Sequence, residues 1–423
     1  MNHASQISHR KVLILPRKPL FTHLFLLLFL ATVASSAFGQ TFSTLYNFGA
    51  TPHDGQAPAA GVIIDPNGNL FGTTGRGAVR DSDGIVFELS PPANAGDLWI
   101  ETVLHRFRGT PDGKIPLGRL VMNSDGVLFG TTLQGGANDL GTAYRVARGN
   151  RPGVWREKPI HDFGTVPDDA VSPNLGLFNA PEGLYGVDQG GANNTGAVYL
   201  LTPPAKGSVW TQNILYSFGA FQSGDAAFPS GELVRDASGN FYGVTAQGGV
   251  NNLGAVYELS PPAVPGNPWT ETVIYSFNFT DGTLPAGRLL LGAHGELYGT
   301  ASGGGTSQAG LVFQLDPPAV QGNSWTQTIL YEFTGSSDGS TPESGVIADS
   351  RGRLFGAAAD TVFMLRPPRI QGRPWKETML HTFAGPDGFT VSGPLTLAKK
   401  ALYGTTSQAG AFGKGTVFQV TIP

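Results

Sequence analysis

Residues 239–262 read GNFYGVTAQGGVNNLGAVYELSPP, and the fold can be predicted from this stretch and its repetition. Two runs rich in aromatic and β-branched residues, FYGVTA and AVYELS, flank a loop of Gln, Gly and Asn. Such runs are typical of β-strands, while Gly and Asn accept the positive φ angles that tight strand reversals require. The stretch therefore predicts two antiparallel strands joined by a short loop.

The same phrase recurs along the chain about every 55 residues. At one position of this unit an aromatic residue precedes a glycine in all seven copies: Gly72, Gly130, Gly186, Gly243, Gly299, Gly356 and Gly404. All six tryptophans occupy one position of this unit: Trp99, Trp155, Trp210, Trp269, Trp325 and Trp375. Each unit divides into four strand-like runs, and no segment after residue 40 has a sustained helical period of apolar residues.

Seven helix-free units of four short strands predict an all-β, seven-bladed β-propeller with four antiparallel strands per blade. A β-solenoid is the alternative, but its coils usually need only about 20–30 residues. The glycines of the second strand, such as Gly243 and Gly299, are interpreted as points where neighbouring blades approach closely.

The two ends of the repeat region predict how the ring closes. Residues 41–48, TFSTLYNF, match the fourth strand of a unit, as in WTETVIYSF at 269–277. The last run, GTVFQVTIP, matches a third strand. The N-terminal strand is therefore expected to complete the last blade in a three-plus-one closure that leaves no open sheet edge.

Residues 1–39 differ from the repeats. A basic leader precedes an apolar run of about a dozen residues that ends in small residues, as in secretory signal peptides. We expect cleavage after Ala37 or Gly39 and export of a propeller comprising residues 40–423, to the periplasm or outside the cell. An uncleaved membrane anchor is the alternative, but the apolar run is shorter than the roughly 20 residues needed to span a bilayer. After removal of the leader we predict no membrane insertion.

Composition excludes several classes of function. The chain has 60 Gly and 31 Pro, no Cys, and a net charge of only -4. Without Cys there is no disulfide, no Cys-based metal centre and no thiol nucleophile. The body of the chain has no basic run, so nucleic acid is not predicted as a partner. No HExxH, GxSxG or P-loop motif is present, and we predict no cofactor, no catalytic residue and no metal site.

The units LYGTASGGGTSQAGLVFQLDPP at 297–318 and LYGTTSQAGAFGKGTVFQV at 402–420 resemble the GloVer tandem repeats of secreted bacterial proteins. The resemblance covers essentially all of the chain after the leader. It implies a secreted repeat protein and supplies no catalytic residues.

Acidic residues recur in every connection from a fourth strand to the next first strand. In a propeller these connections share one face, so the Asp residues form either a cation or polyol site at the channel mouth or a set of turns in which Asp binds the local backbone. The candidates from this set are Asp112, Asp169, Asp225 and Asp281. The segment with Asp81, Asp83 and Gly84 resembles a calcium loop, but the remaining ligand positions are missing.

The loop between the second and third strands opens on the same face. It reads QGGANDLG, QGGANNTG and QGGVNNLG in three consecutive units. Side-chain amides both donate and accept, which suits hydroxyl-rich ligands, although Asn also favours turns. The candidates are Gln134, Asn138, Gln189, Asn194, Gln247 and Asn252. His105, His161 and His381 share a position with tyrosines of other units, so they are interpreted as packing residues.

These patterns predict an exported, non-catalytic propeller that binds a glycan, a peptide or a protein partner on the Asp-bearing face. The alternative is a propeller enzyme that acts on a polysaccharide, as a lyase or hydrolase, with paired carboxylates at the channel mouth. A structural role in a surface layer is a third hypothesis. Irregular charged residues that point inward from one or two blades would favour the enzyme.

Overall fold

The computed structural model describes residues 40–77, 83–94, 96–151, 153–207, 209–219, 224–320, 322–370 and 372–423. The expected leader (1–39) and Asp81 of the calcium-like segment lie outside them. The described residues form 31 strands in seven sheets, and no helix is assigned among them. Accordingly, none of these residues belongs to a helix able to cross a membrane.

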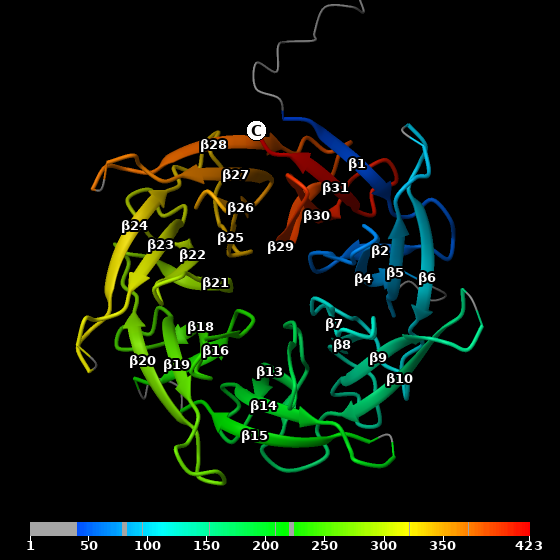
Figure 1. Cartoon of the computed structure of the whole chain (residues 1–423), viewed down its shortest axis with the longest axis horizontal. Coiled ribbons are helices and arrows are strands. Elements are labelled where there is room, and N and C mark those ends of the chain that lie inside the picture. The colour runs from blue at the N-terminus through cyan, green and yellow to red at the C-terminus, as the bar shows by residue number, and fades with distance from the viewer. Residues whose placement is uncertain are drawn as a thin grey trace, which may run out of the picture. The chain divides into compact units, whose positions relative to one another are not determined.

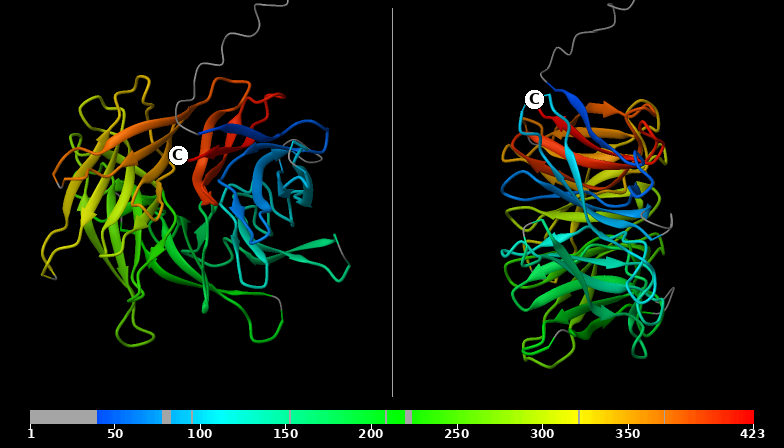
Figure 2. Two further views of the ribbon diagram at one scale, coloured as in Figure 1. Left: turned by 45° about the horizontal axis from the view of Figure 1, so that its top comes forward. Right: turned by 90° about the vertical axis from the view of Figure 1, so that its right-hand side faces the viewer.

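The seven sheets of residues 40–423 surround a common axis as the blades of a propeller (Figure 1). Connecting loops project from both faces of this ring (Figure 2). Blade one contains β2 (Gly55–Pro58), β3 (Ile63–Ile64), β4 (Leu70–Gly77), β5 (Ile85–Ser90) and β6 (Ile100–Arg106). Blade two contains β7 (Val121–Met122), β8 (Leu128–Thr132), β9 (Thr142–Arg148) and β10 (Trp155–Asp162). Blade three contains β11 (Ala170–Val171), β12 (Phe178–Ala180), β13 (Gly183–Gly190), β14 (Ala197–Thr202) and β15 (Thr211–Ser217).

The remaining blades follow in chain order. Blade four contains β16 (Ala226–Pro229), β17 (Val234–Arg235), β18 (Phe241–Gly248), β19 (Ala255–Ser260) and β20 (Thr270–Ser276). Blade five contains β21 (Thr283–Leu291), β22 (Leu297–Gly303), β23 (Leu311–Asp316) and β24 (Thr326–Glu332). Blade six contains β25 (Val346–Ala348), β26 (Leu354–Ala358), β27 (Thr361–Arg366) and β28 (Lys376–Thr382). Blade seven contains β29 (Phe389–Ala398), β30 (Ala401–Gln408), β31 (Thr416–Thr421) and β1 (Phe42–Asn47).

Burial explains the composition of the strands. The middle strands β18 and β19 are mostly buried on both faces, which is why they read as nearly continuous apolar and small residues. The outer strand β20, TETVIYS, alternates between exposed and partly buried residues at its start. The core lies between successive sheets and is rich in fully buried Phe and Tyr side chains.

The N-terminal strand closes the ring. β1 pairs antiparallel with β31, with Phe42 opposite Val420 and Asn47 opposite Thr416, in a sheet of order β1-β31-β30-β29. Figure 1 shows β1 beside β31, although these strands come from opposite ends of the chain. The seven-bladed propeller predicted from the repeat is confirmed.

The second-strand glycines have a different function from the one predicted. A Cβ atom at Gly243 would clash with the ring of Tyr257, and a Cβ at Gly299 would clash with Phe313. Both rings are fully buried and belong to the third strand of the same blade. These glycines therefore make room for an aromatic ring within the blade, and the prediction that they mark contacts between blades was wrong.

Close approach between blades occurs at other glycines. A Cβ at Gly231 would clash with the carbonyl oxygen of Gly287 in the next blade, and a Cβ at Gly118 would clash with that of Leu175. Both glycines lie next to the propeller axis, where the blades converge and the backbones have the least room. Only glycine fits at these two positions, because the backbone of the next blade occupies the space that a side chain would need.

Candidate functional site

The candidate Asp residues bind the turns in which they lie. Each carboxylate accepts a hydrogen bond from a backbone N–H a few residues earlier: Asp112 from Arg108 at 3.1 Å, Asp169 from Thr165 at 2.9 Å, Asp225 from Gly219 at 2.5 Å and Asp281 from Asn278 at 2.8 Å. In addition, two tyrosine hydroxyl groups of the outer strands donate to these carboxylates: Tyr216 to Asp225 and Tyr275 to Asp281, each with an oxygen–oxygen distance of 2.9 Å. These contacts support the turn interpretation of the Asp residues.

The candidate Asn residues also stabilise their own loops. The Asn138 amide donates to the carbonyl oxygens of Phe163 and Gly164 at 3.2 and 3.1 Å. Asn194 and Asn252 adopt positive φ angles of 55° and 56°, a conformation that Asn accepts more readily than most residues. Asn138 is therefore not structurally equivalent to Asn194 and Asn252, although all three serve a turn.

The three Gln side chains differ from these Asn and Asp residues. Within the described part of the chain, the side-chain amides of Gln134, Gln189 and Gln247 have no hydrogen-bond partner. Gln189 pairs through its backbone with Val171, and Gln247 with Ala227, at the start of the loop between the second and third strands. Hydrogen bonds from Gly191 to Asp169 and from Gly249 to Asp225 place these loops beside the Asp-bearing connections. The Gln amides on this face are thus free to contact a ligand.

Sequence reasoning missed a charged cluster on the propeller axis. Arg119, Glu232 and Arg288 each follow a glycine in the innermost segment of a blade, in PLGRL, PSGEL and PAGRL. The register of the first two strands places Gly or Pro at this position in the other four units: Gly61, Gly176, Gly345 and Pro394. The signal that could have revealed the cluster is this break in the sevenfold pattern.

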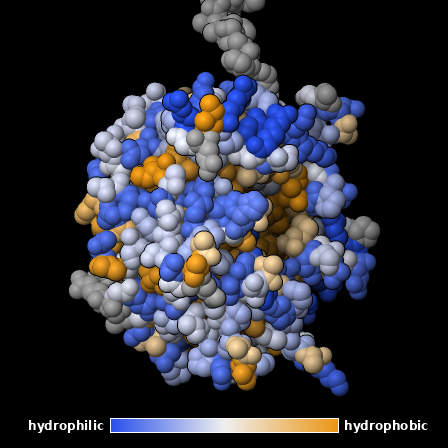
Figure 3. All heavy atoms as spheres, turned by 60° about the vertical axis from the view of Figure 1, so that its left-hand side comes forward, coloured by the Kyte–Doolittle hydropathy of each residue, from blue (hydrophilic) through white to orange (hydrophobic). Residues whose placement is uncertain are grey.

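The cluster lines two cavities of 140 and 370 Å³. Residues from all seven blades line the smaller cavity, so it lies on the axis, and it also contains Asn174 and Glu343. Both cavities include Arg119, Glu232 and Arg288, which therefore stand where the two meet. Figure 3 shows a hollow with apolar walls in a surface that is otherwise mostly hydrophilic.

The charges of the cluster are incompletely paired. Arg119 donates from Nη2 to Thr396 Oγ1 at 3.2 Å, while its buried Nε has no hydrogen-bond partner among the described residues. Burial lowers the pKa of Arg119, although the charge of Glu232 opposes this effect. Burial raises the pKa of Glu232, although the charges of Arg119 and Arg288 oppose it. The cluster therefore retains hydrogen-bonding capacity that a ligand could use.

Comparison with known proteins places the fold and the family. A PL25 ulvan lyase is 11% identical with a TM-score of 0.53, and the match covers 90% of this chain and 95% of that one. The β-propeller domain of Cps50 (Swd1) from Myceliophteria thermophila is 10% identical with a TM-score of 0.50, covering 90% and 99%. At such low identity these similarities show the propeller fold alone.

A third solved structure is longer than this chain. The extracellular domain of the putative hybrid two-component system BT3049 from B. thetaiotaomicron is 12% identical with a TM-score of 0.49; the match covers 90% of this chain but only 41% of that one. No curated protein sequence matches the chain. The model of the Gloeobacter/Verrucomicrobia repeat matches residues 31–187 and 158–363. Because these regions cover most of the sequence, the chain belongs to the Gloeobacter/Verrucomicrobia repeat family, as its motifs predicted.

Proposed function

We propose that this protein is an exported glycan-binding propeller whose ligand enters the axial cavity from the Asp-bearing face. The observation that carries the proposal is the charged cluster of Arg119, Glu232 and Arg288, at a position where the other four blades have Gly or Pro. Placing charged groups in a partly enclosed channel is unfavourable unless they are paired or used. Guanidinium donors next to a carboxylate acceptor match the hydroxyl groups of a saccharide.

The surroundings of the cluster support a polar ligand of extended shape. Asn174 and Glu343 add an amide and a second carboxylate to the smaller cavity. The unpartnered amides of Gln134, Gln189 and Gln247 lie on the Asp-bearing face. They would contact the part of the ligand that extends outside the channel. One ulvan lyase of similar fold has been solved bound to a saccharide of glucuronate and sulfated rhamnose. A polysaccharide that contains uronate is therefore the first ligand to test.

Binding of uronate-containing oligosaccharides by isothermal titration calorimetry tests the proposal. We expect Arg288→Gln and Glu232→Gln to lower the affinity at least about tenfold, since hydrogen bonds to charged groups contribute roughly 1.5–3 kcal/mol. The control is Arg366→Gln, which makes the same change on the exposed end of β27. Equal affinity of all three variants for a bound glycan would place its site elsewhere.

An enzyme is the second candidate, because the irregular charged residues expected of an enzyme line the axial cavity, and two of them are the carboxylates Glu232 and Glu343. A hydrolase or lyase requires such a pair or an equivalent acid and base. Incubation of a bound polysaccharide with the protein, followed by assays for new reducing ends and unsaturated uronates, distinguishes the two functions. Binding without products supports the non-catalytic propeller, and products that disappear in Glu232→Gln support the enzyme.

A further inference from the structure

A polar cluster lies at each boundary between neighbouring blades, near the outer rim. It combines a Tyr or His of one outer strand, the Asp of the following connection, and the residue two positions after the Trp of the next blade. The sets are Tyr46–Asp54–Glu101, His105–Asp112–Glu157, His161–Asp169–Gln212, Tyr216–Asp225–Glu271, Tyr275–Asp281–Gln327, Tyr331–Asp338–Glu377 and His381–Asp387–Phe42. We call this set of contacts the outer seam.

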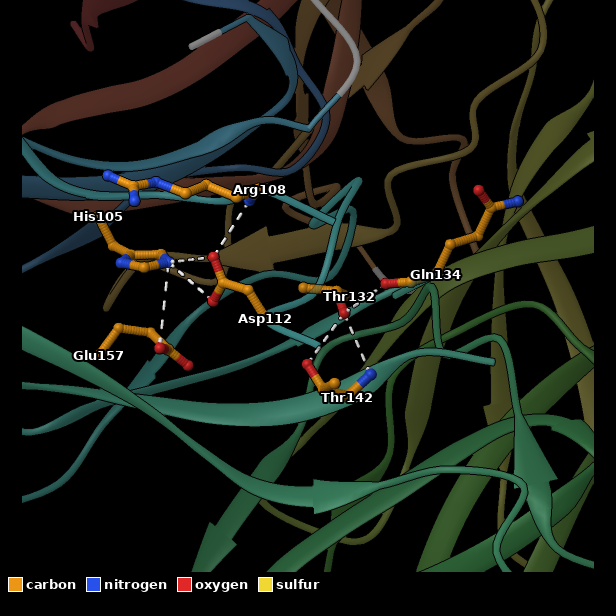
Figure 4. Close-up of polar contacts among 7 residues, drawn as sticks. All are labelled: His105, Arg108, Asp112, Thr132, Gln134, Thr142 and Glu157. Atoms are coloured by element: carbon orange, nitrogen blue, oxygen red, sulfur yellow. Dashed lines mark hydrogen bonds and ion pairs between the residues drawn. The ribbon is translucent and has the colours of Figure 1, made fainter. Parts of the chain in front are cut away.

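One member of the outer seam has the composition of a metal site. His105 Nε2 lies 3.1 Å from Asp112 Oδ1 and 4.0 Å from Glu157 Oε2. The three groups converge in Figure 4, where Gln134 points away from them. Among the described residues, these are the His and carboxylate side chains whose potential ligand atoms gather within 4.8 Å of one another. The other six seam sets lack either the His or one of the two carboxylates.

Glu157 points into this group without a partner that satisfies it. Its side chain is only 7% exposed, and its Oε1 atom is buried with no hydrogen-bond partner among the described residues. A buried carboxylate oxygen without a hydrogen-bond partner is unfavourable, and Asp112 adds a second negative charge nearby. The two neighbouring carboxylates therefore concentrate negative charge at this site.

We propose that His105, Asp112 and Glu157 bind a divalent transition-metal ion of the Zn²⁺ class. Ligand atoms about 2.0 Å from a tetrahedral ion are about 3.3 Å from one another, so the observed separations of 3.1 and 4.0 Å need only small side-chain shifts. One imidazole nitrogen and two carboxylates suit this class of ion better than Ca²⁺ or Mg²⁺. His105 and Asp112 are 21% and 19% exposed, which leaves room for water as the fourth ligand.

The position of the ion assigns it a structural function. His105 belongs to β6 of blade one and Asp112 to the connection that follows, whereas Glu157 belongs to β10 of blade two. The Arg108 N–H, which donates to Asp112 Oδ2 at 3.1 Å, holds one ligand in place. An ion at this position would link two blades at their rim. The site differs from our sequence expectation of no metal, which rested on motifs within a continuous stretch.

The chain itself supplies conservative test variants. Gln replaces Glu at the equivalent position of two other seam sets, and Tyr replaces His in four. Glu157→Gln and His105→Tyr should therefore fold while each removes one ligand. The control Glu271→Gln makes the same change in a seam set that has Tyr216 in place of His.

Zn²⁺ bound to the purified protein after dialysis, measured by mass spectrometry of the metal, tests the site. We expect one Zn²⁺ per chain in the original protein and in Glu271→Gln, and a loss of this ion in Glu157→Gln and His105→Tyr. Thermal unfolding gives a second readout: added Zn²⁺ should raise the melting temperature only of the first two proteins. No bound Zn²⁺ in the original protein, or equal binding by all four proteins, would overturn the proposal.

Discussion

Replacing Glu271 by Gln should change how the stability of the propeller depends on pH. Glu271 lies at the outer seam beside Asp225, which accepts the hydroxyl hydrogen of Tyr216 at 2.9 Å. The Oε1 atom of Glu271 is buried and has no hydrogen-bond partner among the described residues. Burial, followed by the negative charge of Asp225, raises the pKa of Glu271 from 4.5 to about 8.

The sign of the effect follows from the raised pKa. Between about pH 4.5 and pH 8 the folded protein holds a proton on Glu271 that the unfolded chain has lost. The contribution of Glu271 to stability is therefore fully present below about pH 4.5 and is lost as the pH rises toward 8. One proton corresponds to about 1.4 kcal/mol per pH unit, so the loss between pH 5 and pH 7 is at most about 3 kcal/mol.

A Gln side chain at this position should fold into the same seam without titrating. Gln327 shows the arrangement: its Oε1 accepts from Tyr275 at 3.1 Å, and its Nε2 donates to the carbonyl oxygen of Asp281 at 2.8 Å. We therefore expect Glu271→Gln to be more stable than the original protein at pH 7–8 and to gain little at pH 5. The free energy of unfolding of the variant should fall less steeply with pH, by up to about 1.4 kcal/mol per pH unit.

Urea unfolding at pH 5, 6, 7 and 8 in the presence of a chelator measures this difference directly. The chelator excludes any contribution from a metal ion bound by His105, Asp112 and Glu157. Parallel plots of unfolding free energy against pH for the two proteins would refute the reasoning, because they would show that Glu271 is ionised to the same extent in the folded and unfolded states.

Three further predictions concern closure, packing and export. Deleting residues 41–48 should cause aggregation or a large fall in melting temperature, because it removes the partly buried apolar side chains of β1 and the fully buried Phe48, and full burial of such a side chain contributes roughly 1.5–3 kcal/mol. An unchanged melting temperature would contradict closure by this strand. Gly231→Ala should lower the melting temperature far more than Gly149→Ala, where the nearest atom to a Cβ lies 3.2 Å away, and similar losses would argue against backbone contact between blades. Mass spectrometry of exported protein should find a terminus at Phe38 or Gln40, and recovery of an intact Met1 would reject the signal peptide.

Much of the fold was predictable because each strand and turn is encoded locally and then repeated. Seven copies of one pattern establish the number of blades. The repeat region begins with a fourth strand and ends with a third strand, which indicates that the N-terminal strand completes the last blade. The second-strand glycines were misinterpreted for a physical reason. A glycine shows that a side chain does not fit, but whether Tyr257 of the same blade or the backbone of the next blade fills the space depends on the three-dimensional arrangement.

The candidate site was harder to predict. Asp and Asn bind a local turn and a ligand through the same oxygen atoms, so only the partners in the structure distinguish the two uses. Asp225 accepts a hydrogen bond from the backbone N–H of Gly219, and Asn138 donates to the backbone carbonyl of Phe163. The sequence could not show these partners. The axial cluster was missed for the opposite reason. The search followed residues common to all units, whereas Arg119, Glu232 and Arg288 depart from the repeat.

The outer seam shows why no single unit of a repeat protein reveals such chemistry. His105 appears equivalent to Tyr216 when units are aligned, and this equivalence led us to interpret it as a packing residue. Its environment is nevertheless decided by Glu157, which belongs to the next unit; the other two boundaries that contain His have Gln212 or Phe42 instead. Because the contacts join residues of successive units, the informative combination runs from one unit to the next. The seven boundaries therefore share one backbone arrangement and can differ in proton and metal affinity through substitutions at only two positions.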